Sequence, residues 1–155
     1  MADYFLDASA VVKRYATEPG SERILAITEV AAGNAIVLAE LTLVEVAAAL
    51  AAKQRTPRGL SLKDRDRALS RFLQECAEQF LLFRVERDVI DQAVELTQKH
   101  RLRGYDAVQL ASAILANRIL MEQGHSPLTF VAADSDLLSA AQAEGLPIED
   151  PTQRT

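Results

Sequence analysis

The sequence contains one cysteine, Cys76, and no tryptophan. A single cysteine cannot form an internal disulfide, and it excludes a zinc site built from several cysteines, so we expect a protein of the reducing cytoplasm. The apolar runs are too short to span a membrane, and even LTLVEVAAALAA is interrupted by Glu45. The N-terminal MADYFLDASA lacks the basic and apolar segments of a secretory signal. We therefore expect no contact with a membrane.

What is present fits a single compact domain over residues 1–155. Apolar residues make up 49% of the chain and charged residues 25%, with only six glycines and five prolines. These proportions are typical of a globular protein with a substantial core, and they exclude a disordered or collagen-like chain. The formal net charge is −5, from 17 basic and 22 acidic residues. An acidic balance is unfavourable for binding nucleic-acid phosphates, so the positions of the acids matter more than their number.

Short apolar segments alternate with helical patterns along the chain. Because such strands read as continuous apolar runs when helices cover both faces of a parallel sheet, the pattern predicts an α/β fold. Its architecture is a three-layer α/β/α sandwich with a central parallel sheet. The expected strands are 4–6, 35–38, 80–85 and 128–133, with a short edge strand at 146–148, and the expected helices are 8–15, 21–31, 42–53, 61–78, 87–100, 106–121 and 137–143.

Four carboxylates lie where such a sheet places its sites, beyond the carboxyl ends of the strands. Asp7 and Asp134 directly follow the first and fourth strands, so both belong at one edge of the sheet. Glu45 is near the start of the helix that leaves the second strand, and Asp106 is in the first turn of a later helix. No Lys or Arg lies three or four residues from Glu45, so its charge on an apolar helix needs another partner.

Each acid also has a purely structural interpretation. Asp7 and Asp106 could cap helices, and Asp134 could begin a turn or a helix. Four carboxylates at one edge, however, repel one another unless a cation binds or some of them are protonated. Mg²⁺ prefers such oxygen ligands, Mn²⁺ is a possible substitute, and a pair of these ions can activate water for phosphodiester cleavage. The lone cysteine and the two histidines argue against zinc.

With these acids and their flanks, the sequence resembles PIN-domain ribonucleases, specifically the VapC-like toxins of bacterial type II toxin–antitoxin systems. The resemblance is carried, in the family's order, by YFLDASAVVKRYATEPGSE, LTLVEVAAALAAK, LRGYDAVQLASAILA and FVAADSDLLSAAQAEGL. It implies a metal-dependent endoribonuclease, a homodimer and a cognate VapB-like antitoxin that covers the acidic pocket. The implied catalytic and metal-binding residues are Asp7, Glu45, Asp106 and Asp134, with Ser9 and Asp136 in supporting positions. Where members often carry Thr or Ser two residues before the fourth acid, this chain has Ala132, which weakens the expected support of Asp134.

An RNA substrate is compatible with the charge. Setting the four site carboxylates aside leaves 18 acidic residues against 17 basic ones. Basic residues that could hold phosphates cluster at 13–14, 53–58 and 99–103, and Tyr105 is the best candidate for base stacking. For the antitoxin we expect apolar anchors around Val11, Val12, Ile24 and Ile27 together with the helix 61–78.

Two other functions stay open at this point. One is a phosphatase-like hydrolase with Asp7 as its nucleophile, although such enzymes usually carry a second aspartate two residues later, where this chain has Ser9. The other is a PIN-like binding module without catalysis.

Overall fold

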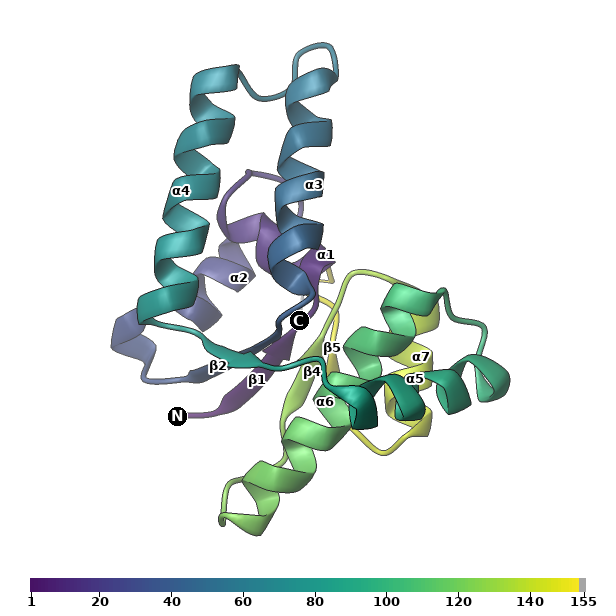
Figure 1. Ribbon diagram of the computed structural model, residues 1–155. Coiled ribbons are helices and arrows are strands. Elements are labelled where there is room, and N and C mark those ends of the chain that lie inside the picture. The colour runs from purple at the N-terminus through teal and green to yellow at the C-terminus, as the bar shows by residue number, and fades with distance from the viewer. Residues whose placement is uncertain (154–155) are drawn as a thin grey trace.

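Five parallel strands form one sheet in the order β3-β2-β1-β4-β5. Figure 1 shows this sheet in a computed structural model, which describes residues 1–153. The first strand of the chain is therefore central, with a neighbour on each side. The parallel sheet predicted from the sequence is confirmed. The strands are β1 (Asp3–Leu6), β2 (Ala35–Ala39), β3 (Leu81–Phe83), β4 (Thr129–Val131) and β5 (Ile148–Glu149).

Helices cover both faces of the sheet and complete the three expected layers. In Figure 1, α1 to α4 lie on one side, with α3 and α4 extending upward as a hairpin, and α5 to α7 lie on the other. Within the described residues no helix is long and apolar enough to cross a membrane. The helices are α1 (Ala8–Val11), α2 (Ser21–Thr28), α3 (Thr42–Arg55), α4 (Leu62–Glu78), α5 (Arg87–Lys99), α6 (Gly104–Glu122) and α7 (Ser135–Ala143), with 3₁₀ turns η1 (Val12–Arg14) and η2 (Val30–Ala32).

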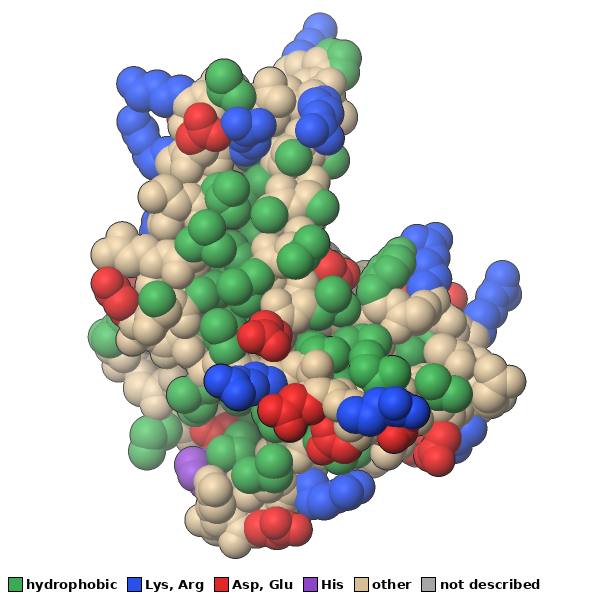
Figure 2. Space-filling model, viewed as in Figure 1, with side chains coloured by type: hydrophobic (Ala, Val, Ile, Leu, Met, Phe, Trp, Pro, Cys, Tyr) green, Lys and Arg blue, Asp and Glu red, His purple; other side chains and the backbone are tan. Residues whose placement is uncertain are grey.

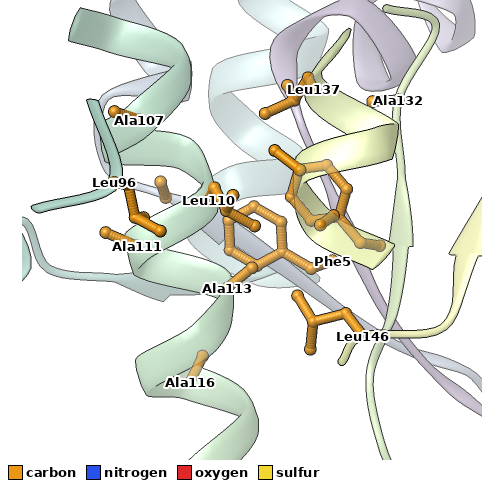
Figure 3. Packing of buried hydrophobic residues seen from close by; sticks show 14 of the residues in the cluster. Phe5, Leu96, Ala107, Leu110, Ala111, Ala113, Ala116, Ala132, Leu137 and Leu146 are labelled. Atoms are coloured by element: carbon orange, nitrogen blue, oxygen red, sulfur yellow. The ribbon is translucent and has the colours of Figure 1, made fainter. Parts of the chain in front are cut away.

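Alternation along the strands divides the core into two clusters. Successive strand side chains point to opposite faces, so Phe5 packs under α5, α6 and α7 while Leu6 packs under α1 to α4. In the first cluster the Phe5 and Phe130 rings stack with their centroids 5.6 Å apart. Figure 3 shows Phe5 beside Leu110, with small side chains such as Ala113 on the same helix, α6. Each fully buried Phe or Leu contributes about 1.5–3 kcal/mol.

The structure corrects two expectations. The third strand has three residues rather than the expected 80–85, and it is an edge strand, so Leu81 and Leu82 are exposed. Val11, Val12, Ile24 and Ile27 are all buried in the second cluster, so they cannot be the exposed anchor for a partner that we expected. Their helical spacing indicates a buried face, but it does not distinguish core from interface.

Candidate active site

Four elements bring carboxylates to the edge of the sheet where the parallel strands end. Asp7 follows β1, Glu45 lies in the first turn of α3, Asp106 lies in the first turn of α6, and Asp134 precedes α7. The charges of Glu45 and Asp106 both raise the pKa of Asp7, and Asp134 raises the pKa of Asp106, which shows that the acids are neighbours. Acidic side chains accordingly form a row across the middle of the face in Figure 2, with basic ones on either side.

Asp7 is the most buried of the acids, with 5% of its surface exposed. Its Oδ1 accepts hydrogen bonds from the Ser9 hydroxyl (2.7 Å) and from the backbone N–H of Ala10 (3.0 Å). Burial raises the pKa of Asp7 to about 7; these two hydrogen bonds oppose the shift, and the neighbouring carboxylates add to it. Asp7 therefore caps α1, as its structural interpretation predicted, and it is also a carboxylate whose charge the folded protein disfavours.

Ser9 connects two of the strand ends. Its hydroxyl donates to Asp7 and accepts a hydrogen bond of 3.0 Å from the backbone N–H of Ala133, which follows β4. The supporting position assigned to Ser9 thus corresponds to a bridge between β1 and β4. Ala132, two residues before Asp134, is buried in the first apolar cluster. Asp134 obtains its support from its own helix instead, because its Oδ1 accepts from the backbone N–H of Leu137 at 2.9 Å.

Glu45 receives its hydrogen bond from a residue that the sequence analysis missed. The Gln109 side-chain nitrogen donates to Glu45 Oε1 at 2.7 Å and to the Thr42 hydroxyl at 2.8 Å. Burial raises the pKa of Glu45, the Gln109 hydrogen bond lowers it, and the charge of Asp106 raises it. Gln109 is 1% exposed, and its side-chain oxygen is buried with no hydrogen-bond donor among residues 1–153. A polar residue three positions after Asp106, in the mainly apolar stretch AVQLASAILA of this helix, was the signal available in the sequence.

Asp106 and Asp134 differ in their local roles. Asp106 is the third residue of α6, half-buried, and no group among residues 1–153 donates a hydrogen bond to it, so the capping interpretation is wrong for this acid. Its pKa is raised by burial and by the charge of Asp134, while Arg103 opposes the shift. Asp134 is exposed and caps α7, and Asp136 is exposed in the first turn of that helix.

A cavity of about 430 Å³ opens beside these acids. Asp106, Asp134 and Asp136 line one part of it, and His100, Arg101 and Arg103 from the segment between α5 and α6 line another. The cavity is therefore continuous with the acidic edge and has both signs of charge in its wall.

Ion pairing distinguishes the three basic clusters. Lys13 and Lys53 both bind Glu18, at 2.8 and 2.6 Å. Arg14 pairs with Glu75 at 2.8 Å, which leaves these side chains neutralised within the fold. Neither Arg101 nor Arg103 has a carboxylate partner within 4.0 Å in the part of the chain that the structure describes.

The donor set at this edge can be compared with what a divalent cation requires. It consists of carboxylate oxygens, the ligands that Mg²⁺ and Mn²⁺ prefer, and therefore fits such an ion in kind. Burial and neighbouring carboxylates raise the pKa values of Asp7, Glu45 and Asp106, so a cation bound at this edge would favour their charged forms. Within residues 1–153, no three acidic, histidine or cysteine side chains are close enough together to form a ready-made metal site. The acids would have to draw together around an ion.

Known proteins resemble this chain in sequence and in fold. The family model described as "PIN domain" matches residues 4–142. No curated protein matches the sequence.

Solved structures share the fold over nearly the whole chain. A toxin–antitoxin complex from Klebsiella pneumoniae aligns with a TM-score of 0.60 at 16% identity, covering 97% of this chain and 99% of that one. VapC20 of Mycobacterium tuberculosis, described as a sarcin-ricin loop cleaving toxin, aligns with a TM-score of 0.61 at 17% identity, covering 98% and 99%. VapBC-5, a toxin–antitoxin system of the same organism, gives 0.53 at 16% identity, covering 97% and 98%. At these identities the likeness establishes the fold.

Proposed function

Because this chain belongs to the PIN domain family, we propose that it is a metal-dependent endoribonuclease and the toxin of a VapBC-type toxin–antitoxin pair. The observation that carries the proposal is the meeting of Asp7, Glu45, Asp106 and Asp134 at one edge of the sheet, where burial raises the pKa values of Asp7, Glu45 and Asp106 and neighbouring carboxylates raise them further. A purely structural set of acids would be paired with basic residues, as Glu18 and Glu75 are.

In this proposal Asp7, Glu45, Asp106 and Asp134 hold Mg²⁺, for which Mn²⁺ can substitute. When bound, such a cation supplies the positive charge that activates a water and stabilises the negative charge developing on a phosphodiester. Its affinity depends on pH, because the Asp7 carboxyl, with a pKa of about 7, must lose its proton to serve as a ligand.

The surrounding residues position these carboxylates. Ser9 fixes Asp7 Oδ1 while it holds the backbone of Ala133, so the ends of β1 and β4 keep their spacing. Gln109 fixes Glu45 against α6. Within residues 1–153, the Asp106 carboxylate has no hydrogen bond to break before it binds a cation or a water. Fixed hydrogen-bond partners of metal ligands typically affect metal affinity by ten- to a hundredfold.

The proposed partner is a VapB-like antitoxin, and the proposed assembly is a cytoplasmic homodimer. An arginine from the antitoxin suits the site, because a guanidinium can pair with two carboxylates through its planar fork and would take the place of the cation. With the expected anchor residues buried in the core, the apolar contribution falls to exposed side chains of α4, such as Leu62 and Leu73.

The phosphatase alternative is disfavoured by Ser9. The residue two positions after Asp7 must act as a general acid in that mechanism, and here it is a serine whose hydroxyl donates to Asp7 itself. Trapping a phosphoenzyme analogue with beryllofluoride on Asp7 would revive that alternative.

Cleavage of 5′-labelled single-stranded RNA by the purified chain tests the proposal. We expect cleavage in Mg²⁺, loss of cleavage in EDTA, recovery in Mn²⁺, and no activity for Asp7→Asn, Glu45→Gln or Asp106→Asn. Glu95→Gln, which neutralises an exposed acid on α5, is the matched control and should cleave like the unaltered chain. Cleavage that persists in EDTA would refute the metal mechanism. RNA binding without cleavage under any condition would favour a non-catalytic module.

A further inference from the structure

We propose that the cavity beside the acidic cluster binds the nucleotide next to the cleaved bond of a single-stranded RNA, with Arg101 and Arg103 contacting its phosphate. This inference rests on the proposed nuclease function, which it extends from the chemistry of cleavage to the way in which the substrate is held. The cavity shares Asp106 and Asp134 with the acidic cluster, so a nucleotide inside it would lie directly beside the proposed metal ligands.

The size of the cavity suits one nucleotide rather than a duplex. About 430 Å³ falls within the range of 300–1,000 Å³ that is usual for small-ligand sites. Proteins read RNA sequence mainly in single strands, where an individual nucleotide can turn away from its neighbours into such a cavity. Leu102, which also lines it, offers an apolar surface for a sugar or a base.

This wall carries two arginines whose charges are available for a phosphate beside the acidic cluster. Most basic side chains of the other two clusters are already paired with Glu18 or Glu75. Arg101 and Arg103 are both exposed and have no carboxylate partner within residues 1–153. In the same basic cluster, Lys99 and His100 already contact Glu144. Among the described residues of this cluster, Arg101 and Arg103 are therefore the side chains that remain available for a phosphate.

Arg103 is also held in place beside the acids. Its Nη1 donates to the Tyr105 hydroxyl at 2.7 Å. Arg103 is the N-cap residue of α6, so the guanidinium and the Asp106 carboxylate are presented by the same helical turn. A planar guanidinium fixed in this way can bind a phosphate with two parallel hydrogen bonds at little further loss of side-chain entropy.

The test measures the binding of a fluorescein-labelled 12-nucleotide single-stranded RNA by fluorescence anisotropy in EDTA, between 50 and 200 mM KCl. Arg103→Ala should weaken binding about tenfold at the lowest salt, which corresponds to about 1.4 kcal/mol. It should also reduce the slope of log K against log salt by about 0.7, the value for one lost contact with a single-stranded phosphate. Arg101→Ala should act in the same direction, and Arg103→Lys should keep the slope while losing part of the affinity.

Arg118→Ala is the matched control, because Arg118 is exposed, has no carboxylate partner among the described residues, and lies about 18 Å along α6 from Asp106. It removes the same charge and should leave the slope unchanged. Tyr105→Phe, which keeps the ring and removes only the hydroxyl, should weaken RNA binding less than Arg103→Ala does.

The outcomes separate this inference from the function on which it rests. If Arg101→Ala and Arg103→Ala bind and cleave RNA like Arg118→Ala, the cavity is not the subsite, although the nuclease function stands. If the unaltered chain neither binds nor cleaves RNA, the proposed function fails and the inference fails with it. Melting temperatures equal to that of the unaltered chain exclude misfolding as the cause of weaker binding.

Discussion

Neutralising Asp7 should stabilise the metal-free protein while removing the proposed nuclease activity. The folded state raises the pKa of Asp7 from 3.8 to about 7, chiefly through burial. Between these values the folded chain binds more protons than the unfolded chain, so stability is greatest below about pH 4 and falls as the pH rises to about 7. At about 1.4 kcal/mol per pKa unit, a shift of about 3 units costs about 4 kcal/mol once Asp7 is ionised.

The variant Asp7→Asn isolates this cost. Asparagine keeps an oxygen that can accept the hydrogen bonds now donated by Ser9 and Ala10, and it is as good an N-cap as aspartate. We therefore expect a gain of about 4 kcal/mol at pH 8, which shrinks to about 1 kcal/mol at pH 4.5, where Asp7 is protonated in the folded state. For a chain of this length the gain at pH 8 corresponds to a rise in Tm of about 10 °C.

Urea denaturation in EDTA at both pH values measures these differences directly. Asp134→Asn is the control, since that carboxylate also caps a helix but is exposed, and its substitution should change stability little. The reasoning is refuted if Asp7→Asn is no more stable than the unaltered chain at pH 8. It is equally refuted if the gain is the same at pH 4.5, because a pH-independent gain cannot come from the ionisation of Asp7.

Three further predictions concern the same edge of the sheet. Asp106→Asn should melt at or above the temperature of the unaltered chain in EDTA, because it removes like-charge repulsion and no hydrogen bond; a clear drop would contradict this. Gln109→Leu should weaken Mn²⁺ binding, measured by electron paramagnetic resonance, at least tenfold by releasing Glu45; Ser112→Ala, another buried site on α6, should not. The affinity of the proposed antitoxin, measured by calorimetry, should fall as the Mg²⁺ concentration is raised, and Asp7→Ala should also lower it. An affinity that changes in neither case would show that inhibition does not depend on the acidic residues.

The carboxyl-edge placement of Asp7 and Asp134 follows from sequence alone. The carboxyl ends of parallel strands lie at one edge of a sheet, and both residues follow apolar runs that are β1 and β4 in the structure. The strand order could not be derived in the same way, because it depends on which apolar runs pair, and short runs give no register. The exposure of Leu81 and Leu82 follows from that order, since β3 is at the edge.

The partners of the site residues were not predictable, because they come from distant parts of the chain. Gln109 reaches Glu45 across 64 positions, in a contact that joins the helical layers on opposite faces of the sheet at its edge. The ion pair between Arg14 and Glu75 spans 61 positions. A sequence shows that a basic cluster exists, but which of its charges is already neutralised depends on tertiary contacts of this kind.

The division of the site between two layers limits when the site can form during synthesis of the protein. β1 is made first, yet one of its two neighbours, β4, is separated from it by most of the chain. Gln109 precedes β4 in the chain, so its hydrogen bond to Glu45 can form before β4 has been made. The hydrogen bond from the Ala133 amide to Ser9 cannot form until then, and Asp134 is still missing from the cluster. A nascent or prematurely terminated chain that lacks β4 would therefore carry an incomplete acidic cluster, and the proposed nuclease activity would require the strand pairing of β1 with β4.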